Sequence, residues 1–368
     1  MKTRLMTALL CLILLQGVFV SAGASGTWYT FTEDAPPEQM GYLVNEYTGT
    51  VTVTFLGDCT LGGEEKSRNS SLGFFRRIRD NGYEFPMRNL SALTASDDLT
   101  VANLEGVLTD RKLAKVDKKY NFSGPTDYTE ILTSAGIECV TLANNHSHDY
   151  GDAGYADTKA ALASAGISFF GTDCLAVWQN EDGVLIGFTG ASFSVSGNQG
   201  KRYERQMELL RSLGCAAVIT VMHAGEEYTY TPNGYQKQIA NLALKSGASL
   251  VIGHHPHVVQ GYEILSGMPV VYSLGNCSFG GTTHAKDSDA LVVRAELRFE
   301  EGVLAETVLQ FYPISITSDS HYNNYSPAFL TGKDAERVLQ KLKDSTGNGF
   351  EPFDEKNGAA VFCPAVPR

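Results

Sequence analysis

The sequence lacks several features that would assign it to common classes of protein. Its 368 residues contain no internal repeat, no low-complexity tract and no linker rich enough to separate two domains, which favours one large sheet-centred fold. The formal net charge of −12 lacks the basic excess that a nucleic-acid groove needs, so nucleic acid is not an expected partner. Beyond the N-terminal segment, no stretch is apolar enough to span a membrane.

The seven cysteines also lack the spacing of a zinc finger or a CxxC motif. Cys139 and Cys215 lie in or beside apolar, strand-like runs, where cysteine is usually a small buried apolar side chain. We therefore expect free thiols rather than a disulfide framework, although the N-terminus suggests an oxidising environment outside the cell.

The N-terminus has the pattern of a targeting segment. Lys2 and Arg4 precede an almost wholly apolar stretch over residues 5–20, and small residues at 22–24 form a cleavage pattern. Residues 1–24 are therefore predicted to be a signal peptide of an exported protein, secreted or held at the cell surface. The alternative is an uncleaved membrane anchor, although an apolar run of roughly 15 residues is shorter than the ~20 residues of a spanning helix.

From residue 50 the chain alternates β-rich runs with helical patterns, which predicts an α/β fold with mostly parallel strands. Strands are expected at 51–56, 99–104, 139–143, 167–170, 184–189, 216–222 and 249–252, and helices at 71–80, 127–135, 153–165, 203–213 and 235–246. Residues 25–49 carry turn formers without a clear period and are expected to lie on the surface.

The pattern changes after residue 262. Strands at 262–265, 270–273, 290–299 and 303–311, joined by short turns, predict a meander that feeds a second sheet. A further helix is expected at 333–345. The main domain is accordingly predicted to span residues 50–315, followed by a C-terminal extension, 316–368, with one helix.

Polar side chains follow five of the apolar runs at the point where each run ends. They are Asp58; Asn103 and Glu105; Asn144, Asn145, His146 and Asp149; His223 and Glu227; and His254, His255 and His257. In open α/β sheets, ligands bind at the carboxyl ends of the strands. The sequence therefore predicts that these side chains meet at one edge.

Histidines dominate this set, because six of the eight lie in these segments. Imidazole mixed with oxygen donors suits Zn, Mn, Fe or Ni better than Ca. In the series His255-Pro256-His257, an extended backbone would direct both rings to one face, and Pro256 would stiffen the spacing.

Each element also has a purely structural interpretation. A Gly-Asp pair after a strand is commonly a turn, Asn103 and Glu105 could begin a helix, and a single histidine such as His223 is often a satisfied buried side chain. These interpretations would have to hold together at five strand ends, so we favour a joint metal site.

The ordered set of motifs resembles the CapA, or poly-γ-glutamate capsule-synthesis, family, which is similar to the calcineurin-like metallophosphoesterases. The resemblance covers about residues 50–290 and rests on Gly57-Asp58, Asn103-Leu104-Glu105, Ala143-Asn144-Asn145-His146 with Asp149, His223-x-Gly225-x-Glu227, Gly253-x-His255-Pro256-His257 and Ser273-Leu274-Gly275-Asn276. It implies a metallophosphoesterase-like, four-layer α/β/β/α sandwich with a metal site where two sheets meet.

The resemblance also implies roles for individual residues. The metal ligands would be Asp58, Glu105, Asn145, His223, His255 and His257, holding one or two divalent transition-metal ions. His146 resembles the general acid. Asp149 and Glu227 match family positions that we take as further catalytic candidates, and Asn103 and Asn276 as supporting site residues. His254 falls where the family pattern is loose and is left out.

The sequence departs from the wider metallophosphoesterases at two positions. They usually carry a histidine two residues after the first aspartate, where this chain has Thr60, and the bridging carboxylate is Glu105 rather than an aspartate. The metal site that Asp58 would form is then weaker than in those proteins, completed by another ligand, or empty.

The leading hypothesis is an exported protein of the capsule-synthesis type with a metal-dependent, phosphoesterase-like hydrolytic site. The alternative is a non-catalytic factor that binds or assembles a polyanionic extracellular polymer through cations. A third hypothesis is hydrolysis or transfer at amide bonds of the polymer. The expected partners are an extracellular polymer or a phosphoester substrate. A capsule-synthesis membrane complex is a further candidate partner.

Overall fold

The computed structural model describes residues 18–22, 26–38, 40, 46–193, 195–346, 354 and 359–362. Most of the predicted signal peptide therefore lies outside the described residues. Of that segment, Phe19–Ala22 forms β1, which pairs antiparallel with β2 (Thr27–Phe31) at a sheet edge. Among the described residues, no helix combines the length and apolar character needed to cross a bilayer.

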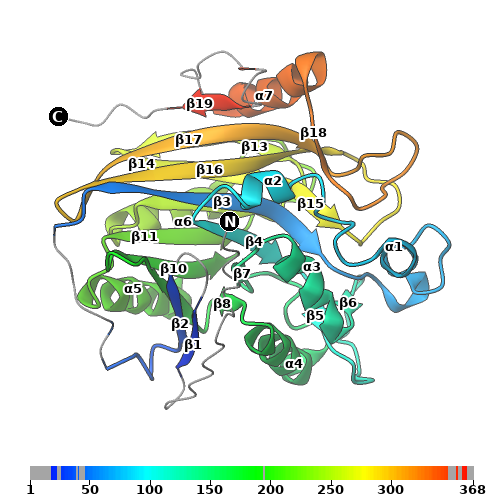
Figure 1. Ribbon diagram of the computed structural model, residues 1–368, viewed down its shortest axis with the longest axis horizontal. Helices are drawn as coiled ribbons and strands as arrows, with labels where there is room; N and C mark the ends of the chain where they lie inside the picture. Colours follow the sequence, from blue (N-terminus) through cyan, green and yellow to red (C-terminus); the bar gives the residue numbers. More distant parts are fainter. Residues whose placement is uncertain are drawn as a thin grey trace, which may run out of the picture.

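Two large sheets form the centre of the molecule (Figure 1). The first has the strand order β18-β17-β16-β3-β4-β7-β8, in which β3, β4, β7 and β8 run parallel. Its strands are β3 (Gly49–Thr60), β4 (Leu99–Leu104), β7 (Cys139–Thr141), β8 (Ser168–Phe170), β16 (Asp289–Glu300), β17 (Val303–Ser315) and β18 (Ala328–Phe329), with β15 (Asn276–Phe279) beside β3 and β19 (Ala360–Phe362) beside β17.

The second sheet has the order β1-β2-β9-β10-β11-β12-β14-β13, in which β10, β11, β12 and β14 run parallel. Its remaining strands are β9 (Leu175–Gln179), β10 (Leu185–Ser192), β11 (Ala217–His223), β12 (Leu250–His254), β13 (Val259–Leu265) and β14 (Met268–Leu274). A small separate pair is formed by β5 (Val107–Leu108) and β6 (Ser123–Gly124).

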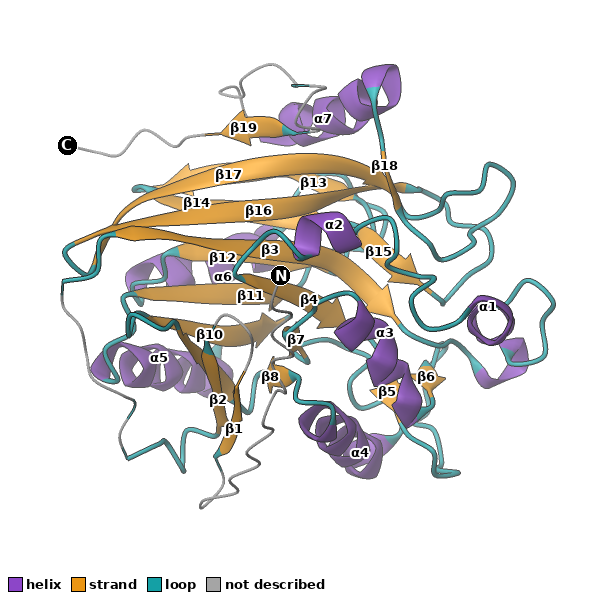
Figure 2. Cartoon of the chain, viewed as in Figure 1, coloured by secondary structure: helices purple, strands orange, loops and turns teal. Residues whose placement is uncertain are grey.

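Helices cover the outer faces of both sheets, whereas the last one, at Gly332–Thr346, places Val338, Leu339 and Leu342 in the core between the sheets (Figure 2). They are α1 (Phe74–Asn81), α2 (Ser91–Thr94), α3 (Thr129–Ser134), α4 (Gly151–Ser164), α5 (Gly197–Ser212), α6 (Gly234–Lys245) and α7 (Gly332–Thr346), with short 3-10 turns at Glu65–Ser67 and Thr126–Tyr128. The helices at 71–80, 127–135, 153–165, 203–213, 235–246 and 333–345 are confirmed. Most ends shift by one to three residues, and α5 begins six residues earlier than predicted, at Gly197.

The buried side chains show why these elements stack in four layers. Successive residues of a strand face opposite sides of a sheet, so Phe55 enters the core between the sheets while Leu56 packs under α1 and α3. In β11, Ile219 likewise joins the inner core and Val218 the core beneath α5 and α6. The predicted four-layer α/β/β/α sandwich is confirmed.

Two expectations about the chain's path are wrong. Residues 27–31 lie inside the fold as β2, with Trp28 and Phe31 buried, because a five-residue strand is too short to show a clear period in the sequence. The division between sheets also falls earlier than residue 262: β9 already belongs to the second sheet, β13 and β14 extend it, and β16 and β17 return to β3. Only long-range pairing decides which sheet a strand joins.

The described cysteines have free thiols, as the sequence predicts. Cys59, Cys139, Cys174, Cys215 and Cys277 are free, and all but Cys215 are fully buried. Cys11 and Cys363 lie outside the described residues.

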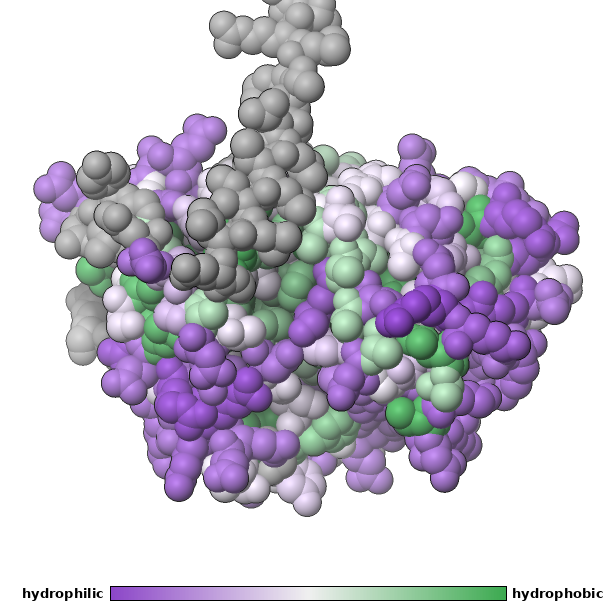
Figure 3. Space-filling view, turned by 90° about the horizontal axis from the view of Figure 1, so that it is seen from below, coloured by the Kyte–Doolittle hydropathy of each residue, from purple (hydrophilic) through white to green (hydrophobic). Residues whose placement is uncertain are grey.

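Hydrophilic side chains surround small groups of apolar ones on the face shown in Figure 3.

Candidate metal centre

The five predicted strand ends meet at one edge where the two sheets face each other. Parallel register places Asp58 of β3 beside Asn103 of β4, and His223 of β11 beside His254 of β12. The Glu105 amide donates to the Cys59 carbonyl at 2.9 Å, which holds the residue after β4 against β3. Parallel pairing therefore converts residues far apart in sequence into one cluster.

A chain of buried amides fixes the first aspartate. Asn103 Nδ2 donates to Asp58 Oδ1 at 2.7 Å, and Asn144 Nδ2 donates to Asn103 Oδ1 at 2.9 Å. Asp58 and Asn103 are fully buried. Unpaired buried amides and carboxylates are costly. These hydrogen bonds therefore hold the Asp58 carboxylate in one orientation.

Glu105 is the least satisfied group in the cluster. Its side chain is fully buried, and neither carboxylate oxygen has a hydrogen-bond partner in the described part of the chain. Burial, together with the negative charge of Asp58, raises its pKa to about 8. A buried carboxylate without partners costs several kcal/mol, so a cation at this point would stabilise the fold.

Imidazoles surround that carboxylate. Glu105 Oε1 lies 3.7 Å from His223 Nε2 and 3.9 Å from His146 Nε2. Ligand atoms of Glu105, His255 and His257 also lie within 4.8 Å of one another. One carboxylate facing several imidazoles is a donor set that fits a transition metal such as Zn, Mn, Fe or Ni.

The His255-Pro256-His257 segment is not extended, contrary to the expectation from sequence. His255 has a φ of 99° and His257 a φ of 56°, both in the left-handed region. The tight backbone nevertheless brings the two ring centroids to 6.0 Å, and the His255 amide donates to Asp58 Oδ2 at 3.3 Å. Such conformations cost about 1–3 kcal/mol each and concentrate at functional sites.

His254 and His257 both lie next to the Asp58 carboxylate. His254 Nδ1 lies 3.1 Å from Asp58 Oδ1, and His257 Nδ1 lies 3.3 Å from Asp58 Oδ2 and 2.8 Å from Asn276 Oδ1. Burial alone would raise the pKa of Asp58, but the adjacent imidazoles of His254 and His257 hold that pKa well below its usual range. His254, which sequence reasoning left out, is therefore part of the cluster; its place at the very end of β12 was the available signal.

His223 and Asn145 form a second contact across the sheets. His223 Nε2 lies 2.8 Å from Asn145 Oδ1, while its Nδ1 lies 3.3 Å from Asn103 Nδ2. Burial lowers the pKa of His223 well below its usual value and that of His255 to about 4. Both rings are therefore neutral near pH 7, which is the form that binds metal.

His146 is oriented by a carboxylate and by a lysine. Its Nδ1 lies 2.8 Å from Asp149 Oδ2, so Nε2 is the nitrogen that faces Glu105. Lys118 Nζ forms an ion pair with Asp149 and donates to the Asn145 carbonyl at 2.7 Å. Burial lowers the pKa of His146. Nothing in the sequence pattern singled out Lys118, because its loop carries no motif.

Two further positions lie at the border of the cluster. Glu227 is exposed and makes no hydrogen bond or ion pair to these histidines in the part of the chain that the structure describes. Thr60 is buried and its hydroxyl has no partner among the described residues. Thr60 supplies no imidazole to the cluster, and the imidazoles next to Asp58 are those of His254 and His257.

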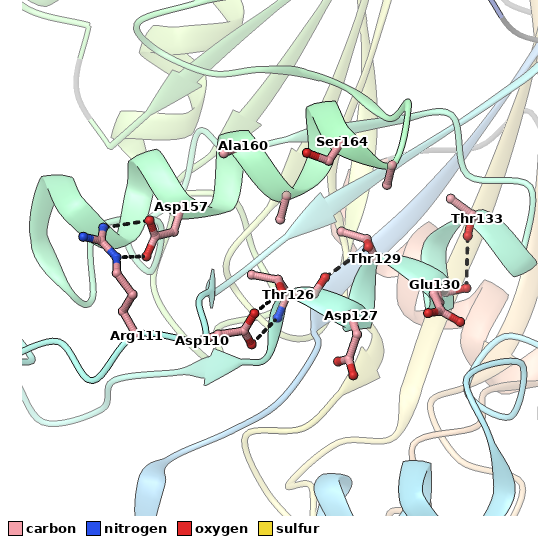
Figure 4. A pocket seen from close by; sticks show the side chains of 12 residues that line it. Asp110, Arg111, Thr126, Asp127, Thr129, Glu130, Thr133, Asp157, Ala160 and Ser164 are labelled. Carbon is pink, nitrogen blue, oxygen red and sulfur yellow. Dashed lines mark hydrogen bonds and ion pairs between the residues drawn. The ribbon is translucent and has the colours of Figure 1, made fainter. Parts of the chain in front are cut away.

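Two of the cavities in the described part of the chain are the most relevant to the site. One of about 720 Å³ is a surface groove between α3 and α4, where Arg111 pairs with Asp157 and Asp110 accepts from the amide of Thr126 (Figure 4). None of the predicted site residues lines it. A second, of about 300 Å³, opens at the end of β10 beside Phe193, whose ring lies 4.9 Å from that of His255. The second cavity therefore borders the histidine and carboxylate cluster.

The fold and this site define a four-layer α/β protein with a buried histidine and carboxylate cluster at its strand ends. The chain belongs to the bacterial capsule synthesis protein family PGA_cap, whose model matches residues 52–176 and 176–280.

Two proteins with similar sequences agree with this assignment. The chain is 28% identical over 352 residues to the capsule biosynthesis protein CapA of Bacillus anthracis, covering 88% of this chain and 79% of that protein. It is 28% identical to the PGA biosynthesis protein CapA of Bacillus subtilis strain 168, covering 65% of this chain and 66% of that protein. A solved structure, TT1561 of Thermus thermophilus, is similar at 12% identity and a TM-score of 0.38, covering 66% of this chain and 94% of that one.

Proposed function

We propose that this protein is an exported, metal-dependent hydrolase that acts during synthesis of an extracellular polyanion. The observation that carries the proposal is Glu105, whose two buried carboxylate oxygens lack hydrogen-bond partners among the described residues and face imidazoles from separate strand ends. Burying an ionised carboxylate without partners is costly, and a cation bound between the two sheets would offset that cost.

The candidate ligands for such a cation gather around Glu105. Ligand atoms of Glu105, His255 and His257 lie within 4.8 Å of one another. His223 Nε2 lies 3.7 Å from Glu105 and 2.8 Å from Asn145 Oδ1, and Asp58 Oδ2 lies 3.3 Å from His257 Nδ1. These residues would hold one or two divalent transition-metal ions, with the Asp58 side lacking a histidine at Thr60. When bound, the cation supplies Lewis acidity that activates water and neutralises charge on the attacked group.

His146 would act as the general acid toward the leaving group. Its Nε2 faces the cluster, because Asp149 occupies the hydrogen bond at Nδ1 and stabilises the ring when it is protonated. Lys118 is a positioning residue, since it holds both Asp149 and the backbone carbonyl of Asn145. The Phe122 ring, 4.4 Å from that of His146, shields the pair from water on one side.

The substrate class follows from the relatives rather than from the cluster. The names of two relatives refer to capsule or PGA biosynthesis, which supports a polymer-linked substrate outside the cell and export through residues 1–24. A phosphoester is the favoured reacting group because of the resemblance to metallophosphoesterases. A capsule-synthesis membrane complex is a proposed partner.

A metal-by-substrate screen tests this function. The full chain is freed of metal, reloaded with Mn, Fe, Zn or Ni, and assayed on an aryl phosphate, an aryl phosphodiester and γ-linked glutamate chains. We expect ester hydrolysis with at least one metal and none after chelation. Cleavage of γ-linked chains alone would reassign the activity to amide bonds.

A second candidate function is a non-catalytic factor that binds the polymer through cations. It is favoured by the absence of a histidine at Thr60 and by the net charge of −12, which favours a cation bridge to a polyanion over direct contact. Polymer retention that requires metal, without hydrolysis of any substrate in the screen, would replace the hydrolase with this function.

A further inference from the structure

A basic segment interrupts the otherwise acidic chain close to the cluster. Residues 111–119 contain five basic residues (Arg111, Lys112, Lys115, Lys118 and Lys119) and one acidic residue (Asp117), whereas the whole chain carries −12. Arg111 and Lys118 are held in ion pairs, while Lys112, Lys115 and Lys119 are exposed and form no ion pair in the described part of the chain. The local charge is therefore opposite to that of the whole molecule.

This segment is attached to the metal cluster. The Val116 amide donates to the Asp149 carbonyl at 2.9 Å, and the Phe122 amide donates to Asp149 Oδ2 at 2.6 Å. Lys119 Nζ lies 4.8 Å from the centre of the Tyr120 ring, and Tyr120 stacks on Phe122 at 6.4 Å. Because Phe122 packs on His146, the lysine reaches the catalytic candidate through two aromatic rings.

A matching lysine and tyrosine stand beside the other half of the cluster. Lys286 Nζ lies 4.0 Å from the centre of the Tyr228 ring, and the Tyr228 and His257 ring centroids are 6.1 Å apart. Phe279 lies 5.1 Å from His257 and 6.1 Å from Phe122, which completes a row of rings between the two lysines. Tyr228 has a φ of 60°, so its backbone is held in an unfavourable conformation at this place.

We propose that Lys119, Tyr120, Tyr228 and Lys286, here called the lysine–tyrosine rim, bind carboxylates of an extended anionic chain and deliver that chain to the metal centre. The inference rests on the proposed function, because it assumes that the polymer is what the metal centre acts on or holds. The rim's lysines are exposed, their ammonium groups lie on aromatic faces, and the row of rings between them includes the proposed metal ligand His257.

The charge around the rim favours spaced carboxylates over a dense polyphosphate. Glu226 and Glu227 are exposed in the loop that follows β11, next to Tyr228 in sequence. The charge around the rim is therefore mixed rather than uniformly positive. A nucleic acid needs a continuous basic surface. A chain with one carboxylate per residue, such as γ-linked glutamate, can place its charges on two separate lysines and on the cation between them.

Charge reversal tests the rim without touching the metal ligands. The full-length Lys119→Glu/Lys286→Glu variant is compared with Lys119→Arg/Lys286→Arg and with Lys237→Glu/Lys333→Glu, a control with the same change of net charge at exposed positions on α6 and α7. Binding of γ-linked glutamate chains of defined length is measured at low and high salt. Metal content and turnover of a small aryl phosphate, which carries no carboxylate for the rim to bind, are measured on the same samples.

We expect the charge-reversed rim to bind the polymer about tenfold or more weakly, with a weaker dependence on salt. Metal content and small-ester turnover should match wild type, and both the arginine variant and the control should bind within about twofold. Equal polymer binding by the rim variant, equal loss in the control, no polymer binding by wild type, or equally tight lysine-dependent binding of polyphosphate would each overturn the inference. If polymer binding depends on the lysines but neither wild type nor any variant hydrolyses an ester, the inference about the rim is kept and the proposed hydrolysis is rejected.

Discussion

His146→Ala is expected to lower turnover of a phosphoester by about 10²–10⁴-fold while the protein keeps its metal. The ring is held by Asp149 through Nδ1 and presents Nε2 toward Glu105, so it can donate a proton at the reacting centre without being a ligand. The measurement is turnover of aryl phosphates with metal content determined on the same sample. The loss should be larger for substrates with poor leaving groups, because those need the proton most.

The matched control is His148→Ala. His148 lies two residues away, is exposed, and stacks on Tyr155 at 4.3 Å rather than facing the cluster. Its replacement should leave turnover within about twofold. Turnover that is unchanged in His146→Ala, or a loss that does not depend on the leaving group, would remove His146 from the role of general acid.

Glu105→Gln is expected to change stability in opposite directions with and without metal. In the metal-free protein, burial raises the pKa of Glu105 from 4.5 to about 8. A carboxyl whose folded pKa lies above its unfolded pKa loses stability as pH rises between the two values, and the penalty stays constant above the higher one. The glutamine variant lacks this loss, so at pH 9 its metal-free form should melt at the same temperature as wild type or higher.

With metal the order should reverse. A ligand present at about 100 times its Kd stabilises a protein by about 2.7 kcal/mol, and the variant should lose most of this gain. Thermal unfolding at pH 9 with and without metal measures both effects. Glu138→Gln is the control, because that carboxylate accepts from the Thr100 amide at 2.8 Å, away from the histidines. A Glu105→Gln protein that metal stabilises as strongly as wild type would show that Glu105 is not a ligand.

Local patterns predicted the elements well because each one is determined by neighbouring residues. The alternation of apolar runs located β3, β4, β7, β10, β11 and β12, and the polar residues after them located the cluster. The carboxyl-end rule for parallel strands needs no knowledge of which sheet a strand joins, so Asp58, Glu105 and His223 could be grouped even though the division into sheets was predicted wrongly.

The features that sequence did not predict depend on tertiary contacts. The left-handed backbone at His255 and His257 is imposed by packing against Asp58, whereas local preference favours an extended chain. His254 enters the cluster because β12 ends directly opposite His223. Lys118 reaches Asp149 across a loop that contains no recognisable motif, and β2 is buried only because β9 pairs with it.

Metal content is the most direct test of the account. The full chain, purified without added metal, is compared by elemental analysis with a His255→Ala/His257→Ala variant, and both are measured again after reloading. We predict about one or two equivalents of Mn, Fe, Zn or Ni in wild type and a large loss in the variant, with the fold retained by circular dichroism. Absence of metal from wild type even after reloading, or equal metal in both proteins, would contradict the claim that this cluster is a metal centre.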